Sequence, residues 1–234
     1  MHTVAVIPAR AGSKRIPNKN IKSFAGQPMI VHSILTLKEA GVFDRIIVST
    51  DSEEIAAVAK AHGAEVPFMR PSELADDHTP TAPVLLHALK ALLDADYSVD
   101  FLCSLYAAAP FARAKDLRMG LDMIRKENVA SVLSVTTFPF PIFRAVKIIE
   151  SGHLRMFWPE HELTRSQDLP DAYHDAGQFY WLDAKAFLGN PKLYTPDAMP
   201  VILPRHLVQD IDTPEDWTRA ELMHKAIHSP EFIA

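Results

Sequence analysis

The sequence predicts an α/β protein of three layers, in which helices cover both faces of a mostly parallel, doubly wound sheet. Short apolar runs typical of buried strands alternate with amphipathic segments typical of helices along most of the chain. A length of 234 residues suits one such domain, and a hydrophobic content of 48% is typical of a globular protein. We therefore expect residues 1–234 to form a single domain.

The first strand and the first helix are predicted from apolar patterning and from the residues that bound it. Residues 3–9 (TVAVIPA) are a short apolar run, which indicates a buried strand. Residues 10–27 have no helical period and contain glycine and proline, so we expect a loop. Apolar side chains recur on one face of residues 28–40. Pro28 suits the first helical position, and Gly41 suits a C-terminal cap.

The next elements continue the alternation of strand and helix. Residues 45–50 (RIIVST) form the second expected strand. Asp51 is expected to cap the helix that follows, with Glu54 completing a capping box and Gly63 ending the helix. The same patterns predict helices over residues 83–93 and 115–126, and strands over residues 100–105 and 129–135.

The alternation stops over residues 138–175, which contain four prolines and no clear helical period. We expect this stretch to be an arm inserted into the domain. Strands over residues 178–182 and 201–203 are expected to resume the sheet. Thr213 is expected to cap the last helix, because a proline and two acidic residues follow it directly.

Charge is distributed unevenly, although the formal net charge is only −5. Residues 1–43 carry +5, and residues 44–234 carry −10. The single cysteine, Cys103, excludes an intramolecular disulfide and a cysteine-based zinc cluster. No apolar run approaches the roughly 18 residues of a transmembrane helix, and no signal-peptide core is evident. We expect a cytoplasmic protein without a membrane partner.

Most of the positive charge of the N-terminal segment lies in residues 8–20 (PARAGSKRIPNKN), directly after the first strand. In open α/β sheets, ligands bind at the carboxyl ends of the strands. Four cations, a hydroxyl and backbone N–H groups with no acidic residue suit a triphosphate. Neither a Walker loop nor a dinucleotide fingerprint is present, because Gly12 is the only early glycine. The alternative is a solvated basic loop.

Asp210 and Asp212 are candidate metal ligands late in the chain. On an extended segment, residues two apart point to the same side. Two hard oxygen ligands, completed by phosphate oxygens, suit Mg²⁺. The alternative is that Asp212 only stabilises the N-terminus of the helix at Thr213.

The motif PARxGSKRxPxKN resembles the opening signature of the CMP-sialic acid synthetase family, whose members are cytidylyltransferases that activate nine-carbon sugar acids. The resemblance covers nearly the whole chain. Residues 48–77, 165–181 and 208–217 are most similar to members that act on pseudaminic acid. The resemblance implies a nucleotide-diphospho-sugar transferase-like fold. It also implies transfer of CMP from CTP to the anomeric hydroxyl of a nonulosonic acid, with pseudaminic acid favoured and pyrophosphate released.

The same resemblance assigns roles to individual residues. Mg²⁺ would be bound by Asp210 and Asp212, and Arg70 would recognise the cytosine ring. The residues expected to bind CTP are Arg10, Ser13, Lys14, Lys19, Asn20, Arg70, Thr79 and Thr81. Those expected to contact the sugar acid are Tyr106, Arg165, Gln167, Gln178 and Tyr180. Those expected to act in catalysis are Arg10, Lys14, Lys19 and Asp212. Alanines replace the family's usual hydroxyl residues in residues 105–111, which argues against ordinary sialic acid as the substrate.

By the same resemblance, the arm at residues 138–175 is a dimerisation element that reaches the sugar site of a partner in a homodimer. The product would feed glycosylation of bacterial surface structures such as flagellin. Two other functions remain open. One is a metal-dependent nucleotide-sugar glycosyltransferase of similar fold, which would use Asp210 and Asp212. The other is a non-catalytic nucleic-acid-binding module. The acidic remainder of the chain argues against it, as does the lack of aromatic residues interleaved with the cations of residues 10–23. We therefore expect no nucleic-acid partner.

Overall fold

The computed structural model describes residues 1–229. The strands of the main sheet are β1 (Thr3–Pro8), β4 (Arg45–Ser49), β5 (Phe101–Leu105), β6 (Ser131–Thr137), β9 (Tyr173–Asp183) and β10 (Met199–Ile202). The helices are α1 (Met29–Ala40), α2 (Glu53–Ala61), α3 (Thr81–Asp94), α4 (Ala114–Glu127), α5 (Ala184–Gly189) and α6 (Pro214–Ile227). Two short hairpins are formed by β2 (Ser23–Phe24) with β3 (Gln27–Pro28) and by β7 (Val146–Ile148) with β8 (Leu154–Met156). Every predicted strand and helix is present, whereas α5 and the two hairpins were not predicted.

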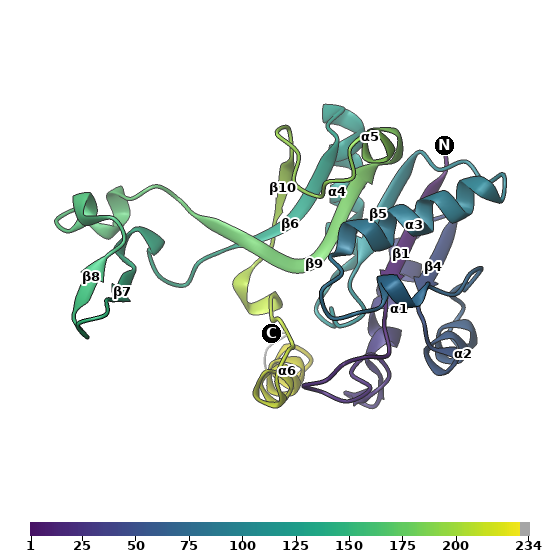
Figure 1. The fold of residues 1–234 in the computed structure, drawn as a ribbon, viewed down its shortest axis with the longest axis horizontal. Helices are drawn as coiled ribbons and strands as arrows, with labels where there is room; N and C mark the ends of the chain where they lie inside the picture. Colours follow the sequence, from purple (N-terminus) through teal and green to yellow (C-terminus); the bar gives the residue numbers. More distant parts are fainter. Residues whose placement is uncertain (230–234) are drawn as a thin grey trace.

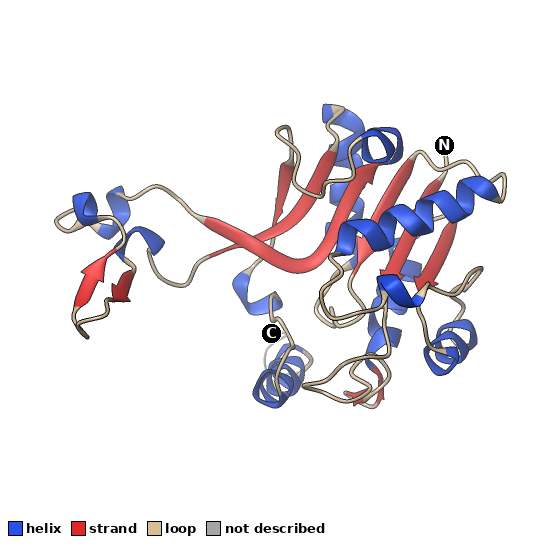
Figure 2. Ribbon diagram, viewed as in Figure 1, coloured by secondary structure: helices blue, strands red, loops and turns tan. Residues whose placement is uncertain are grey.

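The main sheet has six strands in the order β10-β6-β9-β5-β1-β4. β9 runs antiparallel to both of its neighbours, and the other pairs are parallel. Helices lie on both faces of the sheet (Figures 1 and 2). The predicted three-layer, mostly parallel α/β class is therefore confirmed. No helix within residues 1–229 is long and apolar enough to cross a membrane.

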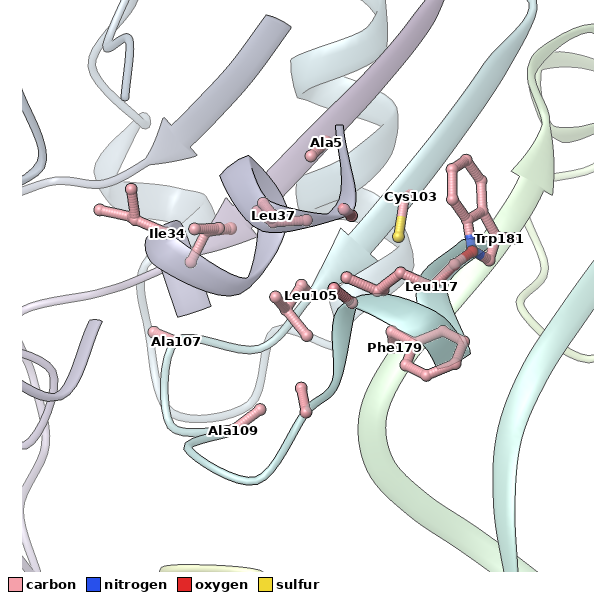
Figure 3. Close-up of a cluster of buried hydrophobic side chains, with 14 of the residues drawn as sticks. Ala5, Ile34, Leu37, Cys103, Leu105, Ala107, Ala109, Leu117, Phe179 and Trp181 are labelled. Atoms are coloured by element: carbon pink, nitrogen blue, oxygen red, sulfur yellow. The ribbon is translucent and has the colours of Figure 1, made fainter. Parts of the chain in front are cut away.

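The central strands supply one apolar layer to each face of the sheet, because successive side chains of a strand point to opposite faces. Ala5 and Ile7 of β1 face α1, α2 and α4, whereas Val4 and Val6 face α3 and α5. Figure 3 shows the first of these layers, which includes Cys103. Burial raises the pKa of the Cys103 thiol well above its ordinary value, so this thiol is unreactive.

A third apolar cluster lies outside the two layers of the sheet. It joins Ile16 of the basic loop to Ile211, the residue between the two candidate metal ligands, and both are buried. Trp217 of α6 and Phe24 of β2 pack in the same cluster, with their rings edge to face at 5.5 Å. This cluster ties the N-terminal loop to the C-terminal segment of the chain.

The ends of α1 and α6 largely follow the sequence prediction. Gly41 adopts the left-handed conformation (φ 65°) at the C-terminus of α1. Pro28 is the N-cap of α1 rather than its first residue, so the helix starts one residue later than predicted. Thr213 caps α6 in a capping box with Asp216.

The predicted cap of α2 is wrong. Ser52 is the N-cap, and its hydroxyl accepts a hydrogen bond from the Ile55 N–H. The third helical position is then Ile55 rather than Glu54, so no capping box forms. The Asp51 carboxylate instead accepts a hydrogen bond of 2.9 Å from the Ala11 N–H in the basic loop.

Residues 138–172 leave the body of the protein as an arm that extends well away from the main sheet (Figure 1). The arm contains the β7–β8 hairpin and short 3₁₀ segments but no α-helix, as the prolines predict. β9 begins at Tyr173, so the last residues of the predicted arm belong to this strand. A shift in register at Leu133 and Val135 of β6 accompanies the curvature of β9 visible in Figure 1.

Gly120 allows α4 to approach the sheet closely. A Cβ atom added at this position would lie 2.5 Å from Cδ1 and 2.7 Å from Nε1 of Trp181. The indole is fully buried, stacks on Phe43 at 5.3 Å and donates a hydrogen bond of 3.1 Å to the Leu117 carbonyl. These contacts prevent the ring from moving aside.

We therefore predict that Gly120→Ala lowers the free energy of unfolding by about 1–3 kcal/mol, because overpacking outweighs the higher helix propensity of alanine. Urea unfolding followed by circular dichroism measures the change. Gly189→Ala is the matched control, since an added Cβ there has no neighbour within 4 Å. An unchanged midpoint for Gly120→Ala would contradict the close packing of α4 on Trp181.

Candidate active site

A cavity of about 280 Å³ lies where β1, β4 and β5 end, at the carboxyl edge of the sheet. Parallel strands place their following loops at this edge, which is why segments far apart in sequence meet here. The cavity collects most of the residues predicted to bind CTP or metal. Its lining includes Arg10, Ser13, Lys19, Asn20, Arg70, Thr79, Thr81, Asp210 and Asp212. Lys14 lies beside it, in a smaller cavity of about 70 Å³ shared with Arg10, Arg15, Lys19 and Asp212.

The basic loop is held in place by side chains that bind its backbone. Asn20 is buried, and its Nδ2 donates a hydrogen bond of 2.9 Å to the Arg10 carbonyl. The Ala11 N–H is bound by Asp51, as described above. These contacts, together with the burial of Ile16, fold the loop across the end of β1 and leave its cations near the cavity.

Two carboxylates pair with the four cations of this loop, which leaves a net positive charge. Arg10 Nη1 lies 2.6 Å from Asp77 Oδ1, and the Lys14 ammonium contacts Asp77 Oδ2. The pKa of the Asp77 carboxyl is lowered to about 2, first by Lys14 and second by Arg10. The sequence predicted that the loop of residues 76–81 lies at the base-binding site but gave no sign that Asp77 pairs with the basic loop.

The other carboxylate is Asp212. Its Oδ2 lies 2.6 Å from Arg15 Nη2, and its Oδ1 lies 3.2 Å from Lys19 Nζ. Lys19 Nζ also donates a hydrogen bond of 2.7 Å to the Ile211 carbonyl. The N-terminal loop and the C-terminal aspartate therefore meet through direct ion pairs.

Arg70 is buried beside the same cavity. Its Nε donates a hydrogen bond of 3.1 Å to Ser49 Oγ, and its Nη2 donates to the Ser49 carbonyl at the end of β4. Burial lowers the pKa of Arg70 to about 10; Asp51 opposes this shift and Arg10 adds to it. The guanidinium therefore remains charged at neutral pH, in an orientation determined by the strand end.

Asp210 and Asp212 both line the cavity, on either side of the buried Ile211. Partial removal of the Asp210 carboxyl from water raises its pKa, and the charge of Asp212 raises it further. The cap of α6 is formed by Thr213 and Asp216, whose carboxylate accepts the Thr213 N–H at 2.8 Å, whereas Asp212 pairs with Arg15 and Lys19. Within residues 1–229, no three or more His, Cys, Asp or Glu side chains are placed to hold a metal. An ion bound to the two aspartates would take its other ligands from substrate or water oxygens.

A second cavity, of about 480 Å³, adjoins the first and shares Tyr106, Gly177 and Asp210 with it. Tyr106 and Tyr180, which were predicted to contact the sugar, both line this second cavity. Tyr180 Oη donates a hydrogen bond of 2.5 Å to Asp175 Oδ2, and burial raises the pKa of Tyr180.

Two further residues line this second cavity but were not predicted, namely Asp175 and Arg219 of α6. Asp175 lies on β9, three residues before Gln178, and this position in the strand could have indicated that it lies near the site. Arg219 had no such signal, because nothing in the sequence of α6 indicates which of its faces meets the cavity.

The other three predicted sugar-binding residues do not reach the cavity of their own chain. Gln178 is buried, and its Nε2 donates a hydrogen bond of 2.5 Å to the Leu207 carbonyl. Arg165 and Gln167 are exposed on the arm, where Arg165 pairs with Asp168 at 2.7 Å. In Figure 1 the arm lies far from the carboxyl edge of the central strands. The family resemblance predicted these residues, but a motif position cannot distinguish a contact with substrate from a structural contact or from a contact with another chain.

A family model described as Cytidylyltransferase matches residues 4–226, nearly the whole chain. The chain belongs to the cytidylyltransferase family. A fold with a cationic loop at the carboxyl edge of the sheet and an aspartate pair opposite it therefore belongs to a nucleotidyltransferase. Membership of this family decides against the glycosyltransferase interpretation.

Three comparisons place this cytidylyltransferase more closely. The pseudaminic acid cytidylyltransferase of Campylobacter jejuni is 39% identical over 232 residues, which are 99% of this chain and 100% of the relative. The CMP-N,N'-diacetyllegionaminic acid synthase of Legionella pneumophila is 33% identical, over 94% of this chain and 95% of the relative. A solved structure of CMP:2-keto-3-deoxy-manno-octonic acid synthetase complexed with CTP has a TM-score of 0.70 at 17% identity. That match covers 96% of this chain and 98% of that chain.

The buried contact of Gln178 leads to a prediction. Gln178→Met should lower the free energy of unfolding by about 1–3 kcal/mol, because the Leu207 carbonyl loses its buried donor. Gln167→Met is the matched control; this glutamine is exposed on the arm, so a change within about 0.5 kcal/mol is expected. Urea unfolding of both variants makes the comparison. Equal stability of the two variants would contradict the structural role of Gln178.

Proposed function

We propose that this cytidylyltransferase transfers CMP from CTP to the anomeric hydroxyl of a nonulosonic acid, with pseudaminic acid favoured. The observation that carries the proposal is the junction of the two cavities at Asp210. The first cavity is lined by cations and the second by hydroxyl and carboxylate groups, so a nucleotide and a sugar would meet beside the aspartate pair. The relatives' substrates, quoted above, support the choice of a nine-carbon acid.

The residues of the first cavity would divide the recognition of CTP among them. Arg70 would donate hydrogen bonds to the cytosine, because its buried guanidinium is anchored at Ser49 and faces the cavity. Thr79, in the loop before α3, and Thr81, the first residue of α3, would also contact the base. Arg10, Ser13, Lys14 and Lys19 would bind the phosphates, and Asn20 would lie near the ribose.

In the proposed reaction, the anomeric oxygen forms a bond to the α-phosphorus of CTP. The bond between that phosphorus and the oxygen bridging to the β-phosphate breaks, pyrophosphate leaves with the electron pair of that bond, and the hydroxyl proton passes to water. Arg10, Lys14 and Lys19 would stabilise the charge that develops on the phosphate oxygens. Asp210 and Asp212 would hold Mg²⁺, which when bound offsets charge at the α-phosphate and favours ionisation of the attacking hydroxyl. Positioning and charge stabilisation thus supply most of the catalysis.

The proposed localisation is the cytoplasm, where CTP is available, with neither membrane nor nucleic acid as a partner. We also propose that the product serves glycosylation of bacterial surface proteins such as flagellin. The second statement rests on the proposed reaction, since a CMP-sugar is an activated donor that a later transferase consumes.

A pyrophosphate-release assay tests the function directly. Each of four nucleoside triphosphates is combined with pseudaminic, legionaminic or sialic acid in the presence of Mg²⁺. We expect release with CTP at least about tenfold faster than with the other nucleotides, because Arg70 recognises the base by directed hydrogen bonds. Pseudaminic acid should give the fastest rate. The proposal fails if CTP gives no release with any of the three acids.

We further propose that the enzyme is a homodimer in which each arm completes the sugar site of its partner. The arm carries large apolar side chains that are more than half exposed, namely Phe140, Val146, Ile148, Leu154, Phe157 and Leu163. Monomeric surfaces seldom leave such a group uncovered. A groove of about 850 Å³ between the base of the arm and α6, lined by Pro139, Met223 and Ile227, offers apolar surface for a partner. Arg165 and Gln167 would then act in the second subunit.

Mixing two inactive variants tests this arrangement. Asp212→Ala should abolish pyrophosphate release, and Arg165→Ala should reduce it at least about tenfold. When the two chains are unfolded together and refolded as mixed dimers, one site in each mixed dimer is intact. We expect recovery of about a quarter of wild-type activity, since half of the dimers are mixed. If mixing restores nothing while each variant alone folds and dimerises, Arg165 acts within its own subunit.

A further inference from the structure

Asp77 occupies the position at the cationic loop where an anionic ligand would bind. Its two carboxylate oxygens contact different cations: Oδ1 lies 2.6 Å from Arg10 Nη1, and Oδ2 contacts the Lys14 ammonium. The side chain of Lys14 is 81% exposed, so water can solvate its ammonium without a protein partner. A carboxylate bridging a guanidinium and an ammonium makes the contacts that two phosphate oxygens would make.

The two anions cannot share these cations in the same geometry. Arg10 also lines the 280 Å³ cavity, whereas Asp77 lies outside its lining. A phosphate that takes the positions beside Arg10 Nη1 and Lys14 Nζ that Asp77 now fills would displace the carboxylate. Because the pKa of Asp77 is about 2, protonation does not release the cations at physiological pH. A competing anion can do so by taking the place of the carboxylate.

The loop that carries Asp77 is folded by a separate set of contacts. The neighbouring Asp76 accepts hydrogen bonds from the His78 N–H at 2.9 Å, the Thr79 N–H at 2.6 Å and the Thr79 hydroxyl at 2.7 Å. Residues 76–79 therefore form a turn that does not depend on Asp77, although the Thr79 hydroxyl also lies 3.3 Å from the Glu73 carbonyl. Thr79, which lines the nucleotide cavity, is part of that turn.

We propose that Asp77 is an internal counter-ion that the triphosphate displaces from Arg10 and Lys14. This inference rests on the proposed binding of CTP in the first cavity. In the absence of nucleotide, the carboxylate offsets part of the positive charge of the phosphate loop and keeps the loop at residues 75–80 attached to it. Displacement by the triphosphate frees residues 75–80 to close on the base, and departure of pyrophosphate allows Asp77 to return. Asp77 also sets a threshold of affinity for anions, because an anion binds here only if its contacts with Arg10 and Lys14 are better than those of the carboxylate that it replaces.

A direct binding experiment tests the proposal with inorganic tripolyphosphate, inorganic phosphate and cytidine as probes. Isothermal calorimetry on the full chain should show that Asp77→Asn binds tripolyphosphate about tenfold more tightly than wild type, since a competing charge at contact distance is removed. Inorganic phosphate should gain by a similar factor. Cytidine, which carries no phosphate, should bind equally to both proteins.

Two control variants separate this effect from a general change in charge. Glu73→Gln removes one negative charge from an exposed residue near the same loop, with no contact to Arg10 or Lys14, and should leave the affinity for tripolyphosphate within about twofold of wild type. Asp77→Glu keeps the charge and should remain close to wild type.

Hydrogen exchange of the amides in residues 75–80 supplies a second readout. Tripolyphosphate should increase their exchange in wild type, whereas exchange in Asp77→Asn should already be raised before the probe is added. Unchanged or weaker binding of tripolyphosphate by Asp77→Asn would overturn the proposal, since it would mean that Asp77 positions Arg10 and Lys14 for the ligand. If wild type and Asp77→Asn both bind no tripolyphosphate, this inference falls. The pyrophosphate-release assay then shows whether the proposed function falls with it.

Discussion

The site depends on the burial of two isoleucines in one apolar cluster. Ile16 lies within the cationic loop and Ile211 lies between the two aspartates, and both pack with Trp217. The ion pairs of Asp212 with Arg15 and Lys19 are partly exposed to solvent, so they contribute little to stability on their own. The apolar contact instead brings opposite charges together from two ends of the chain. Electrostatics at this edge of the sheet is therefore organised by hydrophobic packing.

Much of the fold could be predicted from the sequence, because the main elements have local causes. A continuous apolar run defines β1, and Gly41 ends α1 through a conformation that glycine favours. The cap of α2 was misassigned, since Asp51 and Ser52 are both good N-cap residues and only tertiary structure draws Asp51 to Ala11. The antiparallel direction of β9 was also beyond local patterning, because a strand's direction depends on the path of the arm.

The candidate site shows the same division between local and non-local information. Motif residues such as Arg70 and Asp210 could be predicted individually, and the structure brings them to one cavity. Gln178 was predicted to contact the sugar, and its place on a strand does not reveal that it bonds the buried Leu207 carbonyl. Asp77 was missed for a related reason. Its partners lie more than sixty residues away, and charge counting along the loop of residues 8–20 cannot show an acidic residue supplied from elsewhere.

The reversed direction of β9 has a consequence for how this architecture can change during evolution. An antiparallel strand among parallel ones starts at the edge where its neighbours end, so the chain enters β9 beside the second cavity. Any segment inserted between β6 and β9 must therefore leave and return at the edge of the sheet that carries the cavities. Lengthening or replacing that segment would alter what reaches the second cavity and leave the hydrogen-bonded sheet intact. Substrate preference and assembly can thus diversify at one attachment point while the nucleotide-binding half stays constant.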